Sequence, residues 1–520
     1  MLLTYFGNDR DIFDDAFYNS AEGGFDIALL SASSTQVTVR NEETGYTTRL
    51  TGTGLAASDD PADLAGTLTG LEISSPTGVI ASFTGLNWDL PALYTALEQL
   101  FDSDDDAALM ALLSSAPLTV DASSSNTNST FLLDQVTTPV TYLGSKLLDE
   151  ITTGSGDDRL FGDGFAGSYA EEASGQVYRL YQATLDRAPD LTGHHNWTER
   201  LLTGTMSLQE VINGFTGSPE FKATYGNLDN QSFVTLLYNN VLDRDPDATG
   251  LTNWTARLDG GMSRAEVVKG FSESAEFKAG TAGAAFAYTY AFAEDSSAAT
   301  WGDDVYRLYQ ATLDRAPDIN GFLNWSGRLA DGMELSKVID GFVQSAEFKA
   351  TYGALDNGDF VTLLYNNVLD RDPDATGLTN WTARLDGGMS RAQVVEGFSQ
   401  STEFKAATAD ALKEWLRDVD YGSGSIYHDL LHPGAGDNLL AGGIGADAFE
   451  FAQAEGGSHR VLDLEPWDYI SLEGFGYADG AAALSHMSQA GSDVSFEDQG
   501  VSITFSQTLL AEITDDMILV

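Results

Sequence analysis

Two glycine- and aspartate-rich nonapeptides stand in tandem near the C-terminal end, and they constrain the fold more than any other feature of the chain. They read PGAGDNLLA over 433–441 and GGIGADAFE over 442–450. The glycines allow tight turns with exposed carbonyls, and the sixth position supplies a side-chain oxygen, from Asn438 and from Asp447. The eighth position holds a large apolar residue that can point inward. This pattern predicts short parallel strands stacked on one another, with a glycine turn between them.

A third copy of the pattern lies far upstream. Residues 153–161 read TGSGDDRLF, with Asp158 at the oxygen position, and Gly162 begins another repeat that breaks off. Oxygen donors in a flexible turn suit Ca²⁺, so we expect calcium to bind between the turns of a parallel β-roll. The helical region between the copies is then either an insertion into one roll or a bridge between two. The calcium ligands expected from the pattern are Gly154, Gly156, Asp158, Gly434, Gly436, Asn438, Gly443, Gly445 and Asp447.

Charge and cysteine content narrow the function classes. The net charge of −52 disfavours nucleic acid and anionic membranes as partners, and it makes the compact chain repel itself unless cations neutralise it. A solubility strategy for salty surroundings is the alternative explanation of this charge. The absence of cysteine excludes disulfides, thiolate catalysis and cysteine-based zinc or iron–sulfur sites.

The two ends of the chain bear on export. The first residues, MLLTYFGNDRDIFDD, show no basic region followed by an apolar one, and no stretch is long enough to span a membrane. The last residues, TDDMILV, resemble the C-terminal signal of type I secretion substrates. That resemblance implies passage through a type I ABC transporter by an uncleaved signal, and a location outside the cell or on its surface.

The middle of the chain is a helical repeat array. Four loops share one motif: DRAPDLTG at 186–193, DRDPDATG at 243–250, DRAPDING at 314–321 and DRDPDATG at 370–377. A tryptophan follows each loop, at Trp197, Trp254, Trp325 and Trp381. The copies alternate as types A and B, and residues 233–265 are identical to 360–392. Apolar spacing predicts three short helices in each copy.

The loop aspartates and the tryptophans each have two interpretations. Asp243, Asp245 and Asp247 have the spacing of the first ligands of an EF-hand, but Trp254 stands where that loop needs a glutamate. Helix capping together with an Arg–Asp contact is therefore favoured. The tryptophans recur at a fixed phase beside apolar residues, which favours core anchors over sugar-stacking platforms, although ligand binding by all four stays an open alternative.

These units resemble a helical family of unknown function found in secreted bacterial proteins. More distantly, the pattern R-x-P-D-x-x-G-x-x-x-W is similar to that of the phycobilisome linker module. The resemblance covers 176–407 and implies a binding or scaffolding module, without catalytic residues to transfer.

The flanking regions are β-rich. In 1–150, the triplet Thr-Gly-Leu recurs at Thr53, Thr69 and Thr84, which favours a β-solenoid. Residues 433–520 resemble the C-terminal domain of serralysin-type proteases and related RTX proteins, through the nonapeptides and the run VLDLEPWDYISLEGFG. By that resemblance, Asp463 and Asp468 complete a calcium site at the end of the roll. His459 and Arg460 depart from the family pattern and put one terminal site in doubt.

No catalytic motif is found. The nearest match to a zinc-protease helix is HDLLH at 428–432, but aspartate replaces the glutamate and Pro433 leaves the helix too short. Pairs of carboxylates could serve a glycoside hydrolase, yet nothing singles one pair out. The sequence also lacks the nucleophile elbow, the P-loop and the dinucleotide fingerprint.

Together these features predict a mixed multidomain protein, in which calcium-binding β-roll or β-solenoid flanks surround a central all-α repeat array. The expected function is that of a secreted, calcium-dependent, non-enzymatic surface or matrix protein that binds cell-surface polysaccharide or like subunits. The alternative is an extracellular glycoside or peptide hydrolase with its site in 1–150. The expected segments are a β-solenoid domain (1–150), a partial β-roll turn (151–165), four helical repeats (170–415), a connector (416–432) and the β-roll with its secretion signal (433–520).

Overall fold

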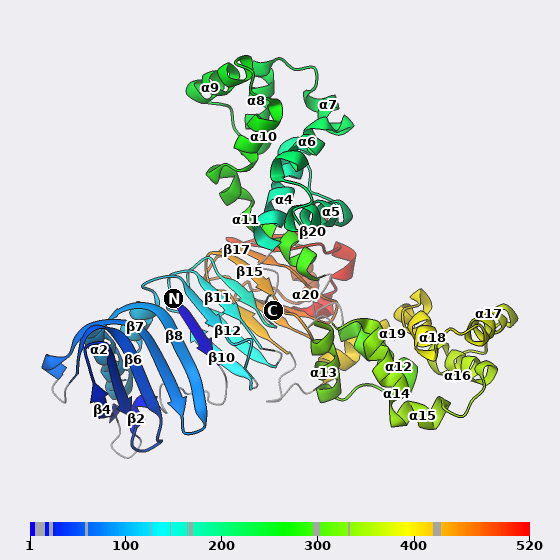
Figure 1. Ribbon diagram of the computed structural model, residues 1–520, viewed down its shortest axis with the longest axis horizontal. Coiled ribbons are helices and arrows are strands. Elements are labelled where there is room, and N and C mark those ends of the chain that lie inside the picture. Colours follow the sequence, from blue (N-terminus) through cyan, green and yellow to red (C-terminus); the bar gives the residue numbers. More distant parts are fainter. Residues whose placement is uncertain are drawn as a thin grey trace. The chain divides into compact units, whose positions relative to one another are not determined.

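The computed structural model forms two compact units, Met1–Gly164 together with Ser297–Val520, and Phe165–Ser296 (Figure 1). Most of the expected connector, at 420–427, and Gly164 of the expected partial turn lie outside the described residues. The structure describes residues 1–5, 16–19, 24–25, 27–57, 61–103, 105–125, 127–145, 147–163, 165, 170–294, 302–330, 333–419 and 428–520.

The N-terminal region is an antiparallel sheet followed by two helices. Its strands pair in the order β1–β8–β7–β6–β5–β4, and Leu68, Phe83 and Trp88 lie in its core. The elements are β1 (Leu2–Tyr5), β2 (Tyr18–Asn19), β3 (Gly24–Phe25), β4 (Ala28–Ala32), β5 (Gln36–Arg40), β6 (Thr47–Ala56), β7 (Ala65–Ser75), β8 (Gly78–Asp89), α2 (Leu90–Ser103) and α3 (Ala107–Leu113).

This sheet differs from the solenoid expected over 1–150. The recurring triplets lie in adjacent antiparallel strands, where the register shifts between Thr53 and Ala56 and between Leu68 and Gly70. Gly54 and Gly85 adopt positive φ angles of 64° and 68° at these irregularities. The triplets therefore mark β-bulges, for which glycine is suited, rather than the turns of a solenoid.

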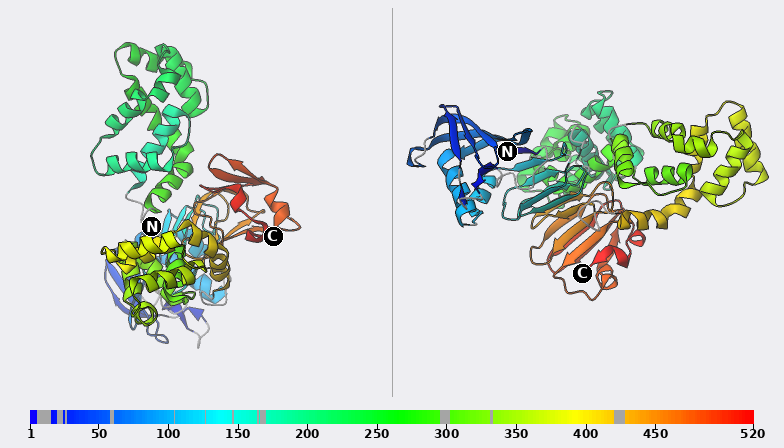
Figure 2. Two further views of the ribbon diagram at one scale, coloured as in Figure 1. Left: turned by 90° about the vertical axis from the view of Figure 1, so that its right-hand side faces the viewer. Right: turned by 90° about the horizontal axis from the view of Figure 1, so that it is seen from below.

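Two sheets of parallel strands follow, and from β9 to β18 the chain passes from one sheet to the other after every strand. The first sheet runs β9–β11–β13–β15–β17–β21 and continues into the N-terminal sheet through β1, and the second runs β10–β12–β14–β16–β18–β22. Apolar residues of both sheets, such as Leu440 and Phe449, share one core. We call this two-sheet structure the roll; its cyan and orange strands lie side by side (Figures 1 and 2).

The strands of the first sheet are β9 (Leu118–Asp121), β11 (Val140–Leu143), β13 (Arg159–Phe161), β15 (Asp437–Ala441), β17 (Gly457–Val461) and β21 (Val501–Phe505). Those of the second are β10 (Ser129–Leu133), β12 (Asp149–Thr153), β14 (Leu430–His432), β16 (Ala448–Ala452), β18 (Tyr469–Glu473) and β22 (Ile518–Leu519). Helix α20 (Gly480–Leu484) and the strands β19 (Met487–Ala490) and β20 (Asp493–Asp498) complete the C-terminal end.

The roll is continuous across the helical repeats. Strand β13 pairs with β15, with Leu160 opposite Leu440, and β12 pairs with β14, with Ile151 opposite Leu431. Both pairings are parallel and join residues 280 positions apart, as the bond from Thr153 Oγ1 to the Pro433 carbonyl also does. The repeats therefore interrupt a single turn of one roll, the turn between β13 and β14.

The helical array of the sequence analysis is confirmed, with one correction. Each copy contains four helices rather than three, because the S-x-E-F-K segment begins a helix of its own. Ser218, Ser345 and Ser401 cap these fourth helices through hydrogen bonds from the backbone N–H three residues later.

The first two copies contain α4 (Glu171–Leu185), α5 (Leu191–Leu202), α6 (Leu208–Gly217), α7 (Pro219–Tyr225), α8 (Asn230–Leu242), α9 (Ala248–Asp259), α10 (Arg264–Ser272) and α11 (Ala275–Glu294). The last two contain α12 (Gly302–Leu313), α13 (Ile319–Ala330), α14 (Leu335–Gln344), α15 (Ala346–Tyr352), α16 (Asn357–Leu369), α17 (Ala375–Asp386), α18 (Arg391–Ser399) and α19 (Thr402–Asp418). Among the described helices, none combines the length and apolar character needed to cross a bilayer.

The last two copies pack against the roll within their unit. Arg417, near the end of α19, donates to the carbonyl oxygens of Trp467 and Asp468 at 2.9 and 3.2 Å, and its guanidinium also bonds Asp516 at 2.6 Å. Apolar residues of the roll, including Ile444, join the core of these helices. The turns before β16 and β18 are therefore covered on this side by helices.

Candidate metal centre

Four aspartates occupy equivalent positions in successive turns along one edge of the roll, which we call the aspartate edge. Asp149 begins β12, and Asp429, Asp447 and Asp468 directly precede β14, β16 and β18. Asp468 Oδ1 accepts from Asp447 N at 3.0 Å, Asp447 Oδ1 from Asp429 N at 3.0 Å, and Asp429 Oδ1 from Asp149 N at 2.7 Å. One carboxylate oxygen each of Asp429, Asp447 and Asp468 thus accepts a hydrogen bond from the backbone of the neighbouring turn.

The other carboxylate oxygens in the middle of this row have no such bond. Asp429 and Asp447 are both 0% exposed, and the Oδ2 atom of each accepts no hydrogen bond from any residue that the structure describes. Burial is the main cause that raises the pKa of each carboxyl well above its usual range, and neighbouring carboxylates raise it further. Buried carboxylates without donors favour either a proton or a bound cation.

Glycines let these carboxylates approach the turns. A Cβ atom at Gly162 would overlap Asp429 Oδ2, and one at Gly442 would overlap Asp447 Oδ2. Gly443 and Gly445 have φ angles of 104° and 114°, which disfavour any residue with a side chain. The glycines of the sequence pattern therefore leave room for the carboxylates, and they also allow the tight turn.

Further carboxylates border the row. Asp463 accepts from the backbone N–H groups of Gly442 and Gly443, each at 3.1 Å, and Asp163 accepts from Ile444 N. Asp163, His428 and Asp429 each offer one donor atom, and these atoms lie within 4.8 Å of one another. The edge thus concentrates oxygen donors, with one imidazole beside them.

The opposite edge of the roll, which we call the amide edge, holds the ladder Asp158–Asn438–His459. Asp158 Oδ1 accepts from Val140 N at 2.7 Å, and Asn438 Oδ1 accepts from Asp158 N at 2.8 Å. The Asn438 amide donates to the carbonyls of Pro433 and Gly434 at 3.2 and 3.3 Å and lies 3.2 Å from His459 Nδ1. The neutral Asn438 amide thus bonds carbonyls that a cation in this turn would use, whereas Asp158 Oδ2 is buried and accepts no hydrogen bond from the described residues.

The sequence-predicted ligands therefore divide between two edges. Gly154, Gly156, Gly434 and Gly436 belong to the amide edge with Asp158 and Asn438, and a Cβ at Gly434 or Gly436 would overlap the carbonyl of Gly154 or Gly156. Gly443, Gly445, Asp447, Asp463 and Asp468 belong to the aspartate edge.

Sequence reasoning missed Asp149, Asp163 and Asp429 as calcium ligands, and it weighed His428 only within the HDLLH zinc motif, which it set aside. A signal for two of them was present, because Asp149 stands nine residues before Asp158 and Asp429 nine residues before Asn438. Nine residues therefore separate a position on one edge of the roll from the equivalent position on the other edge.

The HDLLH segment does not form a helix. Residues Leu430–His432 are strand β14, His428 is buried beside the aspartate row, and His432 Nε2 lies 2.9 Å from Glu455 Oε2. The two histidines thus have different neighbours, unlike the pair that a zinc-protease helix places on one face.

The loop aspartates of the repeats act as helix caps. Asp190, Asp247, Asp318 and Asp374 accept from the N–H groups of Gly193, Gly250, Gly321 and Gly377 at 2.7–2.9 Å. The loop arginines bond glutamates of the fourth helices, as Arg244 does with Glu276 at 2.8 Å, rather than aspartates. N-capping thus accounts for the last aspartate of each loop, Asp247 included, and Asp243 ends α8 as its C-cap with a φ angle of 46°.

The four tryptophans share one environment. Each ring packs against a phenylalanine at a centroid distance of 5.5 Å, and the arginine three residues later lies 4.9–5.0 Å over the ring. A glycine of the third helix leaves room for the ring edge, as Gly214 does for Trp197. Trp197, Trp254, Trp325 and Trp381 are thus half-buried framework residues with one face covered by a guanidinium.

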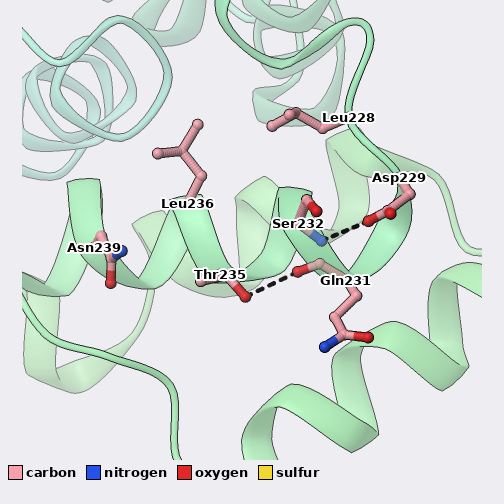
Figure 3. Close-up of a pocket in the computed structure, with 7 residues that line it drawn as sticks. All are labelled: Leu228, Asp229, Gln231, Ser232, Thr235, Leu236 and Asn239. Carbon is pink, nitrogen blue, oxygen red and sulfur yellow. Dashed lines mark hydrogen bonds between the residues drawn. The ribbon is translucent and has the colours of Figure 1, made fainter.

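A pocket of about 530 Å³ lies along α8 (Figure 3). Asp229 Oδ1 accepts from Ser232 N at 2.8 Å, and Thr235 Oγ1 donates to the Gln231 carbonyl at 3.0 Å. In the second type B copy, Gly358 and Asp359 replace Gln231 and Ser232. The pocket is lined by Leu228, Asp229, Gln231, Ser232, Thr235, Leu236 and Asn239.

The profile of a domain of unknown function (DUF4214) matches 160–225, 215–281, 284–352 and 340–408. The chain contains four repeats of this domain. Its matches correspond to the four helical copies described above. No curated protein matches the chain.

Proposed function

We propose that the protein is a calcium-dependent scaffold in which Ca²⁺ bound along the aspartate edge stabilises the roll, and the roll carries the DUF4214 repeats. The observation that supports this most is the buried Oδ2 atom of Asp447, which lies in an uninterrupted turn and accepts no hydrogen bond from described residues. Calcium prefers carboxylate and carbonyl oxygens in flexible loops, and the glycine turns supply both.

Calcium acts in this proposal as a ligand of the folded state. An ion that binds the roll but not the unfolded chain adds about 2.7 kcal/mol of stability at 100 times its Kd, and about 4.1 kcal/mol at 1,000 times. The net charge of −52 increases the effect, since the unliganded roll concentrates repelling carboxylates. In the low calcium of the cytosol, the chain stays open enough for type I export, and it folds outside the cell.

The repeats supply the binding function in this proposal. The partners are cell-surface polysaccharide or like subunits, and the array is not an enzyme. The pocket on α8 supports a polar partner, because Gln231, Ser232 and Asn239 bring amide and hydroxyl groups that can bond sugar hydroxyls.

Thermal unfolding of the full chain tests the calcium proposal. The full chain is required because β15 pairs with β13, so residues 433–520 lack a strand partner when isolated. Calcium should raise the melting temperature of the roll by several degrees over the chelator-treated protein, and Asp447→Asn should reduce this difference. Asp437→Asn, at an exposed position of the same roll, is the matched control. Equal melting with calcium and with chelator would contradict the proposal.

Glycan-array binding and sedimentation of the calcium-loaded chain test the partner. Binding to a polysaccharide class, or concentration-dependent association, would support the scaffold. Turnover in a hydrolase substrate panel would instead favour an enzyme.

A further inference from the structure

The turn interrupted by the helical repeats differs from the other turns of the aspartate edge in its donor atoms. It supplies Asp163 from the chain before the repeats, and His428 and Asp429 from the chain after them. The strand register places His428 level with Ala446 and Trp467 of the next two turns. An imidazole therefore enters the row at this one turn of the described edge.

The donors of this turn converge. One donor atom from each of Asp163, His428 and Asp429 lies within 4.8 Å of the others. His428 Nδ1 is 3.8 Å from Asp429 Oδ2 and 3.9 Å from Asp447 Oδ1. The side chains of His428 and Asp429 are 1% and 0% exposed, so bulk water does not reach these donor atoms.

Asp429 Oδ2 is an independent sign that a ligand belongs here. It is fully buried, it faces the imidazole, and no described residue donates a hydrogen bond to it. Gly162 provides the space on its other side, since a Cβ there would overlap the same oxygen. A buried carboxylate oxygen in such surroundings requires a positive partner or a proton.

We propose that the interrupted turn is a separate metal site, which binds one divalent first-row transition-metal ion of the Zn²⁺ or Mn²⁺ class through Asp163, His428 and Asp429. A mixed nitrogen and oxygen donor set suits these ions, whereas Ca²⁺ takes oxygen donors alone. Bond lengths of about 2.1 Å in tetrahedral geometry place neighbouring donors about 3.4 Å apart. The Nδ1–Oδ2 distance of 3.8 Å closes to that value by a small side-chain rotation.

The ion would join the two ends of the insertion. Asp163 ends the first half of the roll and His428 begins the second, so one ion holds the chain at both sides of 164–427. Calcium in the intact turns stabilises the stack of strands, whereas the proposed ion ties together the two chain segments that flank the repeats. The inference does not depend on calcium binding elsewhere in the roll.

The test is a Zn²⁺ titration of the full chain, stripped of metals and then kept in saturating Ca²⁺, followed by calorimetry. The expected result is one Zn²⁺ per chain, with affinity reduced at least tenfold by His428→Gln and by Asp163→Asn. The second variant changes a partly exposed residue, so it keeps the test decisive if His428→Gln does not fold. Co²⁺ in place of Zn²⁺ should give visible absorption bands that His428→Gln abolishes.

His432→Gln is the matched control, because His432 lies near Glu450 and Glu455 at 3.7 and 2.9 Å and is the competing zinc site in this region. Zinc binding that follows His432, or that Ca²⁺ displaces at stoichiometric concentration, would overturn the inference. Failure of the calcium proposal is distinguishable, since it appears in the melting temperature with and without Ca²⁺ and leaves the effect of His428→Gln on Zn²⁺ unchanged.

Discussion

The two edges of the roll share one kind of hydrogen bond between neighbouring turns, but they differ in the side chains that make it. On both edges a side chain accepts from the backbone of the neighbouring turn, through Asp429 on one and Asn438 on the other. At Asn438 the amide edge supplies its own donors, because the Asn438 amide donates to two carbonyls and meets His459, although Oδ2 of Asp158 on the same edge is buried and accepts no hydrogen bond from the described residues. The aspartate edge leaves carboxylate oxygens buried. A carboxamide brings its own donors, whereas a buried carboxylate without donors favours a proton or a cation, so under the calcium proposal we expect this one side chain to decide whether a turn depends on metal.

The largest expected effect is on the pH dependence of the metal-free roll. Burial raises the pKa of Asp149 to about 7 and that of Asp158 to about 6. Both carboxyls are protonated more readily in the folded chain than in the unfolded one, so their contribution to stability is complete below about pH 4 and is lost as the pH rises through 6 and 7. For Asp149 the loss amounts to roughly 4 kcal/mol over this range.

Chelator-treated protein should therefore melt at a higher temperature at pH 5 than at pH 7.5. Calcium should reverse this order, since protons compete with the ion for the carboxylates. A metal-free melting temperature that rises from pH 5 to pH 7.5 would show that the buried carboxylates are not the dominant groups.

The next effect tests the space that the carboxylates of the aspartate edge need. Gly442→Ala should destabilise the roll by about 2–3 kcal/mol, because its Cβ would overlap the Asp447 carboxylate in a packed turn. Gly217→Ala, at the end of α6 where a Cβ meets no neighbour within 4 Å, should stay within about 1 kcal/mol of the parent. Denaturant unfolding measures both. Equal effects of the two changes would show that the glycines of the aspartate edge serve the backbone alone.

A smaller effect is expected when one amide of the amide edge is replaced by the carboxylate typical of the aspartate edge. Asn438→Asp removes the donors to Pro433 and Gly434 and adds a buried charge, so it should cost about 1–3 kcal/mol in chelator. Calcium should recover much of that loss if the turn geometry suits the ion. The calcium dependence of unfolding for this variant, set against that of the parent, is the measurement. A loss that calcium leaves untouched would mean that the amide edge differs from its counterpart in more than its side chains.

The smallest effect concerns His459. His459→Gln keeps a polar group beside Asn438 and should change stability by about 0.5–1 kcal/mol, with the calcium response unaltered. Differential scanning calorimetry at pH 7.5 with and without calcium checks this. An altered calcium response would place an ion on the amide edge.

Local sequence patterns predicted part of this arrangement. The glycine spacing indicated turns, and it singled out Asp447, which stands in the buried row. The loop motif predicted the helical copies, and their capping follows from residues only three positions apart. Asn438 was expected to be a ligand because its oxygen fits the pattern, but the pattern does not say which groups its amide meets.

Long-range pairing supplied what local patterns could not. The pattern shared by 153–161 and 433–450 left insertion into one roll open, but only the pairing of β13 with β15 across the helical repeats makes Asp163 and His428 neighbours. The N-terminal triplets likewise looked like solenoid turns, whereas pairing between β6, β7 and β8 makes them bulges. Strand register, rather than the choice of residues, decided both cases.

Calcium titration of the metal-stripped full chain by calorimetry tests the difference between the edges most directly. Asp447→Asn on the aspartate edge should lower the number of bound calcium ions, whereas Asp158→Asn on the amide edge should leave that number unchanged. Loss of calcium with Asp158→Asn and none with Asp447→Asn would contradict this account.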